Sequence, residues 1–278
     1  MDKWNLVIDI AKCHDCNNCF LSCKDEYIGN DFLPYSIAQP RHGQRWMNIL
    51  RKERGQCPMV DVAFLPVPCM HCDNAPCIEK AKGGAVYKKS NGIVIIDPEK
   101  ARGQKDIVAA CPYGVIWWNE EKNVAQKCML CAHLLDEGWK EPRCVQSCPT
   151  GALSTVRAED AKMSQIVKNE NLEVLHPEFS TKPRVYYRNL HRFFKCFIGG
   201  NVAIEMEGLT DCVEGARVTL FKNAEKIGEA VTDNYGDFKF DKLTENSGRY
   251  SLEINYQDKK KTVEVELTTS RNVGTILM

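Results

Sequence analysis

Cysteine spacing holds most of the chemical information in this 278-residue sequence, which contains fifteen cysteines. The first group has two, two and three residues between its members, which are Cys13, Cys16, Cys19 and Cys23. In a run of this kind, three thiolates bind one [4Fe-4S] cluster and the last thiolate binds a neighbouring cluster. The first group by itself therefore predicts two clusters.

Further cysteines form three more groups with related spacing. These groups are Cys69, Cys72 and Cys77; Cys111, followed by Pro112; and Cys128, Cys131, Cys144 and Cys148, followed by Pro149. A proline after the last cysteine is typical of bacterial cluster-binding runs. Two of the three groups are incomplete, so some ligands of the expected pattern are missing.

An internal repeat predicts where the missing ligands would be. Residues 9–23 align without gaps with residues 97–111, so that Cys23 corresponds to Cys111. The same offset places three non-ligands opposite the other cysteines of the first group, namely Ala101, Gln104 and Ile107. Residues 144–153 align with residues 77–86 and place Ala81 opposite Cys148. All four losses fall on one site, which predicts a vacated pocket filled by Ala81, Ala101, Ile107 and neighbouring apolar groups.

Paired cluster-binding runs exchange their last cysteine, and this rule assigns the remaining ligands to three complete [4Fe-4S] clusters. The first cluster is predicted to bind Cys13, Cys16, Cys19 and Cys148. The second is predicted to bind Cys128, Cys131, Cys144 and Cys23. The third is predicted to bind Cys69, Cys72, Cys77 and Cys111.

Structural zinc and disulfide bonds are alternative uses of closely spaced cysteines. Zinc sites use cysteine pairs, and the third evenly spaced cysteine of the first group argues against them. A disulfide framework is typical of small secreted proteins, whereas we expect this chain to be intracellular, since it shows no signal peptide. The remaining cysteines have no partner pattern and are predicted to be buried apolar side chains; they are Cys57, Cys196 and Cys212.

The overall composition predicts a cytoplasmic protein with room for two domains. Lysine plus arginine and aspartate plus glutamate both number 37, so the formal net charge of zero gives no support for nucleic-acid or membrane binding. No apolar segment approaches the roughly 20 residues of a membrane span. Three lysines lie beside cluster-binding cysteines and either raise cluster potentials or are ordinary surface residues; they are Lys12, Lys24 and Lys127.

We predict an α+β chain in which residues 1–157 form a double bacterial-ferredoxin-like domain and residues 158–198 a connector. Short strands at 6–10 and 92–96 lead into cysteine runs, and a helix is expected near 158–173. Residues 199–278 are predicted to form a prealbumin-like or immunoglobulin-like β-domain, a sandwich or barrel. Its expected strands are 201–206, 216–222, 230–232, 237–240, 249–256, 261–267 and 272–278.

The cysteine groups resemble those of the iron-sulfur subunits of the dimethyl sulfoxide reductase family of molybdenum enzymes, over residues 1 to about 155. Within that family, the lost site, the segments at 45–49, 123–128 and 181–187, and the C-terminal β-domain are similar to small subunits of pyrogallol-phloroglucinol transhydroxylases. The resemblance implies a non-catalytic electron-transfer subunit in a heterodimer or a multiple of it. The large subunit would contain molybdenum and two molybdopterin guanine dinucleotides, and the phenol chemistry would occur there.

Three other functions are compatible with the same cysteine pattern. The chain could deliver electrons to a related molybdenum reductase or aromatic dehydroxylase. It could be a free-standing polyferredoxin, although the β-domain would then be unexplained. Its clusters could also serve only to stabilise the fold and an interface.

Overall fold

The structure is a computed structural model that describes residues 1–278, and it divides into two compact units. The first unit comprises Met1–Leu50 and Phe64–Leu190, and the second comprises Arg51–Ala63 and His191–Met278. The hairpin of β2 (Asn48–Gln56) and β3 (Met59–Val67) therefore contributes its outer part to the second unit. None of the helices is both long and apolar enough to cross a membrane.

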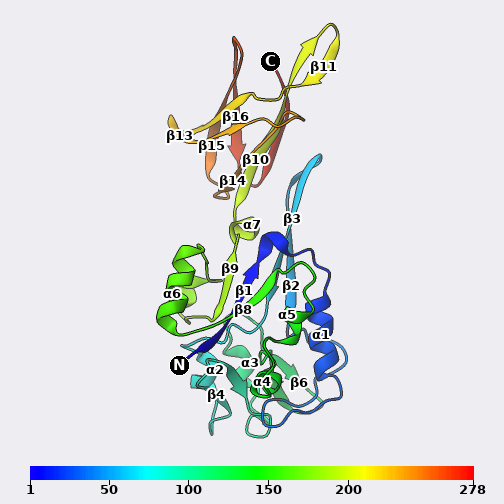
Figure 1. The fold of residues 1–278 in the computed structure, drawn as a ribbon, viewed down its shortest axis with the longest axis vertical. Helices are drawn as coiled ribbons and strands as arrows, with labels where there is room; N and C mark the ends of the chain where they lie inside the picture. Colours follow the sequence, from blue (N-terminus) through cyan, green and yellow to red (C-terminus); the bar gives the residue numbers. More distant parts are fainter. The chain divides into compact units, whose positions relative to one another are not determined.

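A three-stranded sheet in the first unit pairs a strand from the beginning of its sequence with two strands from the end of its sequence (Figure 1). Its central strand β1 (Lys3–Asp9) pairs antiparallel with β8 (Leu153–Ala158) and parallel with β9 (Val185–Arg188). Buried and exposed side chains do not alternate along β1, because all residues from Trp4 to Asp9 are buried. α6 (Asp160–Asn169), which lies inside the helix expected near 158–173, packs Met163 against Val7 of this sheet.

The rest of the first unit consists of short elements joined by loops. Two small hairpins are formed by β4 (Val86–Lys88) with β5 (Val94–Ile96), and by β6 (Trp117–Asn119) with β7 (Val124–Gln126). The short helices that flank the cysteines are α1 (Asn18–Tyr27), α2 (Pro76–Lys80), α3 (Asp106–Ala109), α4 (Ala132–Asp136) and α5 (Arg143–Gln146). Two 3-10 turns, η1 (Ile10–Lys12) and η2 (Pro177–Phe179), complete the unit.

The internal repeat is visible as two equivalent turns. The Asp9 carboxylate accepts a hydrogen bond from the Ala11 amide at 3.0 Å and so caps η1. The Asp97 carboxylate accepts hydrogen bonds from the amides of Glu99 and Lys100, at 3.0 and 3.1 Å. Both aspartates therefore have a turn-forming role, because an Asx side chain satisfies backbone donors just after a strand.

The second unit contains α7 (His191–Phe194) and two four-stranded sheets. One sheet consists of β10 (Cys196–Met206), β11 (Leu209–Cys212), β14 (Asp237–Leu243) and β17 (Arg271–Leu277). The other consists of β12 (Arg217–Lys222), β13 (Glu225–Val231), β15 (Gly248–Tyr256) and β16 (Lys259–Leu267). Both sheets contribute to one hydrophobic core, which includes Ile198, Phe238, Leu220 and Leu252.

Two sequence expectations for this unit differ from the structure. The expected strand at 201–206 begins earlier, at Cys196, and contains Gly199 and Gly200 as interior residues. A Cβ atom at Gly199 would lie 2.3 Å from Met59 Sδ, and one at Gly200 would lie 2.5 Å from Val273 Cγ2. These glycines are therefore sites of close packing inside the strand. The short, fully exposed strand β11 was not expected from the sequence.

The prediction that the three remaining cysteines are buried is correct for one of them. Cys196 is 3% exposed and belongs to the core of the second unit. Cys57 and Cys212 are exposed, so that prediction is wrong for both. Cys57 lies in the turn between β2 and β3 and Cys212 ends the exposed strand β11, where no apolar layer covers them.

Candidate metal centre

Two pairs of short helices bring together cysteines that are far apart in the sequence. α1, which contains Cys19 and Cys23, packs against α5, which contains Cys144. α2, which contains Cys77, packs against α3, which ends just before Cys111. These contacts join the first cysteine group to the fourth and the second group to the third.

A cavity in the first unit is lined by Cys69, Cys72, Cys77 and Cys111. The other lining side chains are mainly apolar and include Val94, Ile116 and Tyr113. Burial raises the pKa of Cys72 to about 12, the nearby charge of Cys69 adds to this rise, and the Thr181 hydroxyl opposes it. Four cysteine sulfur atoms around a mainly apolar space leave sulfur as the main ligand that this cavity offers.

A second cavity is lined by Cys23, Cys128, Cys131 and Cys144. Burial raises the pKa of Cys23 well above its ordinary value, and the charges of Cys128, Cys131 and Cys144 raise it further. Cys23 is separated in sequence from these three neighbours by more than a hundred residues, and only the packing of α1 on α5 brings it here.

The remaining set of neighbouring cysteines consists of Cys13, Cys16, Cys19 and Cys148. Burial raises the pKa of Cys19 to about 12, and the charges of Cys13, Cys148 and Cys16 act in the same direction. This group is the most open of the three, because Cys16 is exposed and Cys13 and Cys148 are partly exposed. Burial disfavours ionisation of Cys148, but amide donors from Leu153 and Ala152 and the Thr150 hydroxyl lower its pKa overall.

The three groups are close enough for a charge in one group to act on a cysteine in another. The charge of Cys19, in the most open group, is one of the influences that raise the pKa of Cys144, after burial and the nearer Cys131 and Cys128. The charge of Cys69 is, after burial, the largest influence that raises the pKa of Cys128. Cys128 and Cys144 both line the second cavity, so this cavity is a neighbour of each of the other two groups.

Iron-sulfur clusters fit these residues better than a single metal ion does. No three histidine, cysteine, aspartate or glutamate side chains lie close enough together to hold one metal ion. A single zinc ion needs sulfur ligands at about 2.3 Å, whereas a cubane cluster holds its four thiolates further apart, at separate iron corners. Two of the thiol groups also enclose a cavity, and the buried Tyr27 hydroxyl beside one of them bonds no nitrogen or oxygen atom of the protein. Four thiol ligands suit either zinc or an iron-sulfur cluster, so the enclosed cavities are what favours clusters here.

Equivalent backbone turns present sulfur atoms in the second and fourth groups. The His71 amide donates to Cys69 Sγ at 3.5 Å, and the Leu130 amide donates to Cys128 Sγ at 3.4 Å. His71 and Leu130 both have positive φ, at 46° and 53°. Amide donors of this kind stabilise negative charge on ligand sulfur and tune cluster potentials.

The positions of the predicted vacated site do not form a comparable thiol pocket. Ala101 and Ile107 are fully buried, as expected, whereas Ala81 is partly exposed. The Gln104 side chain accepts from the Lys82 amide at 2.8 Å and donates to the carbonyls of Lys82 and Lys100, at 3.2 and 2.7 Å. The Gln104 side chain thus connects the two loops near these positions by hydrogen bonds. From the sequence it was identified only as a non-ligand.

Of the three lysines singled out in the sequence, Lys127 is the one buried between cysteine groups. Its ammonium group donates to the carbonyl of Val94 and, at 3.1 Å, to that of Cys128. Burial raises the pKa of Cys77, and the charge of Lys127 is the largest opposing influence. Lys24 instead binds Gln39, Pro40 and Gln44, and its role is to fix that loop. Lys12 is exposed.

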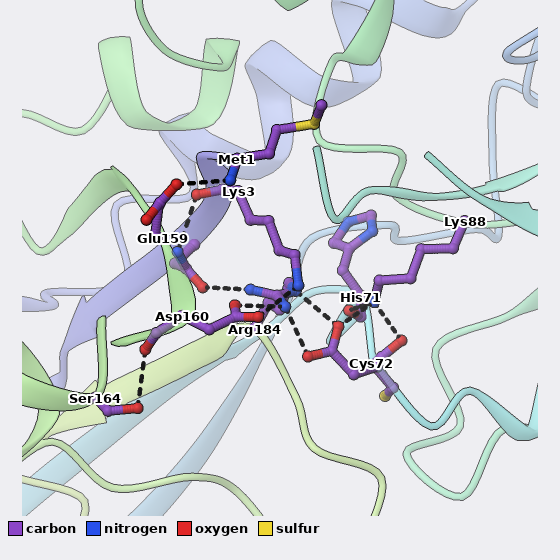
Figure 2. Close-up of polar contacts among 11 residues, drawn as sticks. Met1, Lys3, His71, Cys72, Lys88, Glu159, Asp160, Ser164 and Arg184 are labelled. Carbon is purple, nitrogen blue, oxygen red and sulfur yellow. Dashed lines mark hydrogen bonds and ion pairs between the residues drawn. The ribbon is translucent and has the colours of Figure 1, made fainter. Parts of the chain in front are cut away.

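An ion-pair network holds the loop that contains Cys69 and Cys72 (Figure 2). Arg184 binds both carboxylate oxygens of Asp73, at 2.8 and 2.6 Å, and also contacts Asp160 at 3.0 Å. Lys88 donates to the carbonyls of His71 and Cys72, at 3.1 and 2.7 Å. This network was not apparent from the sequence, because its members lie on four separate segments.

Comparison with known proteins supports this view of the cysteines. Residues 60–158 match a family described as a 4Fe-4S dicluster domain. The chain is 48% identical over 262 residues to the pyrogallol hydroxytransferase small subunit of Pelobacter acidigallici, with 93% of each chain covered. The chain belongs to this family of iron-sulfur subunits.

More distant relatives have the same kind of role. The arsenate respiratory reductase iron-sulfur subunit of Shewanella sp. (strain ANA-3) is 29% identical, with 66% of this chain and 95% of the relative covered. A putative dimethyl sulfoxide reductase iron-sulfur subunit of Halobacterium salinarum is also 29% identical, with 68% and 80% covered. The chain is thus an electron-transfer iron-sulfur subunit, and its relatives are small subunits of larger enzyme complexes.

Proposed function

We propose that this chain binds three [4Fe-4S] clusters and transfers electrons within a cytoplasmic molybdenum enzyme of the pyrogallol-phloroglucinol transhydroxylase type. The first cluster would bind Cys13, Cys16, Cys19 and Cys148. The second would bind Cys23, Cys128, Cys131 and Cys144. The third would bind Cys69, Cys72, Cys77 and Cys111. The observation that best supports this assignment is that cysteines of paired sequence groups surround the same cavities.

The proposal also includes a detailed assignment of the domains. Residues 1–157 would be a double ferredoxin-like domain that has lost one cluster site, and residues 199–278 a prealbumin-like or immunoglobulin-like β-domain. Residues 158–198 would be a connector, most of which packs with the first unit because its strand β9 pairs with β1. The two equivalent Asp turns and the two helix pairs support the first part. The shared core of two four-stranded sheets supports the β-domain.

Each bound cluster would accept and release single electrons. The residues of this chain would determine how readily each site does so. Exposure of Cys16 and several amide donors near Cys148 favour extra negative charge at the first site. Apolar walls disfavour extra negative charge at the second site. At the third site, burial also disfavours negative charge, and Lys127 offsets part of this effect near Cys77. Because hydroxyl transfer between two phenols is redox-neutral overall, these sites need not support net current.

The partner would be a large subunit with molybdenum and two molybdopterin guanine dinucleotides. The relative that is 48% identical is the small subunit of an enzyme whose name states hydroxyl transfer from pyrogallol. An electron-delivering subunit of a molybdenum reductase is the second candidate, because a relative at 29% identity belongs to an arsenate respiratory reductase.

Purification of the untagged complex from its native source under anoxic conditions would test this proposal. We expect about twelve iron atoms and twelve sulfides per chain, which is three clusters of four, together with a molybdenum-containing partner. Conversion of pyrogallol without an external electron donor would distinguish a transhydroxylase from a reductase. About sixteen iron atoms, or a lone chain without molybdenum, would contradict the proposal.

A further inference from the structure

Tyr27 is the last residue of α1, and its ring forms part of the wall of the second cavity. The side chain is 1% exposed. Three rings hold it in place: Trp46 with centroids 4.8 Å apart, His133 at 5.6 Å and Phe32 at 5.7 Å. The phenol therefore cannot turn away to find a solvent partner.

The Tyr27 hydroxyl is buried and bonds no nitrogen or oxygen atom of the protein; the Cys131 thiol is the group with which it interacts. Apart from the four cysteines, the other residues that line this cavity are apolar: Met47, Met129, Leu130 and Pro142. A buried hydroxyl without a nitrogen or oxygen acceptor is unfavourable, so such a group in a native protein calls for an explanation. A sulfur atom of a cluster in the cavity would supply an acceptor.

We propose that the Tyr27 hydroxyl donates a hydrogen bond to sulfur at the second cluster, either Cys131 Sγ or a bridging sulfide, and thereby raises the reduction potential of that cluster. This inference rests on the proposed function, because it requires a cluster in the second cavity. Tyr27 is a positioning and tuning residue in this view, and it takes no part in substrate chemistry.

Electrostatics at the site support this direction of effect. Reduction adds one negative charge to the cluster, and an apolar surrounding disfavours that charge. A donor fixed beside the sulfur favours the more negative state, and hydrogen bonds to sulfur are a known determinant of cluster potential. In agreement with this geometry, burial raises the pKa of Cys131 and the Tyr27 hydroxyl is the largest opposing influence.

The hydroxyl groups near the other two sites differ in their surroundings. The Thr181 hydroxyl near Cys72 already bonds the Tyr113 hydroxyl at 2.6 Å. The Thr150 hydroxyl lies 3.7 Å from Cys148 Sγ in a partly exposed position. Tyr27 is the one of the three hydroxyls that is fully buried and bonds no other hydroxyl, amide or carbonyl group. Its removal should therefore affect the second cluster alone.

The test is an EPR-monitored redox titration of the complete complex with Tyr27→Phe. The second cluster is identified as the titration wave that is lost in Cys131→Ser. At a fixed ambient potential we expect Tyr27→Phe to lower the ratio of reduced to oxidised second cluster about tenfold, a shift of about 59 mV for a one-electron couple. The other two waves should not move.

Tyr187→Phe is the matched control. Tyr187 is fully buried in the same unit, but its hydroxyl donates to the Pro66 carbonyl at 3.0 Å and it lines neither cavity. The wave of the second cluster should be unchanged in this variant. An unshifted second wave in fully loaded Tyr27→Phe, or an equal shift in Tyr187→Phe, would overturn the inference.

A second substitution covers the case in which Tyr27→Phe does not load its clusters. In Tyr27→3,5-difluorotyrosine the hydroxyl is a stronger donor at the same position in the cavity wall. This variant should move the second wave to higher potential, opposite to Tyr27→Phe, and a wave at the wild-type position or below would contradict the inference. The iron content of the wild-type complex distinguishes failure of the Tyr27 inference from failure of the proposed function. If the wild-type complex lacks the second cluster, the proposed function itself is contradicted.

Discussion

The two units of this chain bury their side chains in different ways. The second unit has a continuous apolar core to which both sheets contribute, including Ile198, Leu252 and Leu267. In the first unit, eight cysteines are buried, and two of the cysteine groups surround cavities rather than packing against one another; the eight are Cys19, Cys23, Cys69, Cys72, Cys77, Cys128, Cys131 and Cys144. We therefore expect side-chain packing to stabilise the second unit without a cofactor, whereas the first unit would need its clusters as part of its core.

Removal of the clusters should have the largest effect and should separate the two units most clearly. Folding and metal-ligand binding are coupled when the thiolates have no preformed site in the unfolded chain. After iron chelation we expect amide hydrogens of the first unit to exchange rapidly, while β12 and β15 keep their protection. Hydrogen-exchange mass spectrometry measures both units in one sample. Equal loss of protection in both units would refute the comparison.

Single cysteine substitutions should next divide the first unit into separate sites. Cys23→Ser should lose only the second cluster, about four of twelve iron atoms, because Cys23 lies with Cys128, Cys131 and Cys144. Cys77→Ser should lose only the third cluster. Iron analysis and EPR of each variant test this pairing. If Cys23→Ser instead removed the cluster of Cys13, Cys16 and Cys19, the exchange of last ligands between runs would be wrong.

A core substitution should destabilise the second unit without changing the metal content. Leu252 is fully buried in the shared core, and truncation to alanine should cost about 2–5 kcal/mol of unfolding free energy. Iron per chain should stay the same. Val231→Ala is the control, because Val231 is 61% exposed and should change stability by less than about 0.5 kcal/mol. Loss of iron in Leu252→Ala would show that the two units do not differ in this way.

An acid-sensitive ion-pair network should also distinguish the second unit. Burial disfavours the charged Asp61, but Arg54 and Arg192 outweigh it and lower its pKa to about 2. A depressed pKa stabilises the fold above the unfolded value of about 3.9, and this stability is lost as pH falls towards 2. Asp61→Asn should therefore cost about 2 kcal/mol at pH 7, and its difference from wild type should shrink near pH 3.

Urea titrations at pH 7, 4 and 3, read from fluorotyrosine at Tyr250, measure this effect within the second unit. Asp258→Asn, at an exposed turn, is the control and should follow the wild type at each pH. A difference between Asp61→Asn and wild type that does not depend on pH would exclude the ion-pair explanation.

The smallest expected effect concerns the site that has lost its ligands. Gln104→Ala removes three hydrogen bonds between loops of the first unit and should cost about 1 kcal/mol, because the side chain is partly exposed. The iron content should not change. Gln165→Ala, at an exposed position of α6, should leave stability nearly unaltered. A gain or loss of iron in Gln104→Ala would show that this region takes part in cluster binding.

Much of the organisation was predictable from the sequence because both units follow regular spacing rules. The strands at 6–10 and 92–96 match β1 and β5 to within a few residues, and seven strands were expected where eight occur. The missed strand β11 is short and exposed on all residues, so it has no hydrophobic alternation to detect. The early start of β10 was missed because the close neighbours of Gly199 and Gly200, which are Met59 and Val273, are distant in sequence.

The sequence by itself determined the ligand chemistry, because thiolate spacing and the two internal repeats are local properties of the chain. It also predicted which cysteine groups associate, as one cluster-binding run cannot complete a site without its partner. Only the tertiary structure decided what surrounds the sulfur atoms. The hydroxyl of Tyr27, the ammonium group of Lys127 and the amide of Gln104 act on neighbours more than twenty residues away in the sequence. Burial and electrostatics arise from the folded environment, and no spacing pattern specifies them.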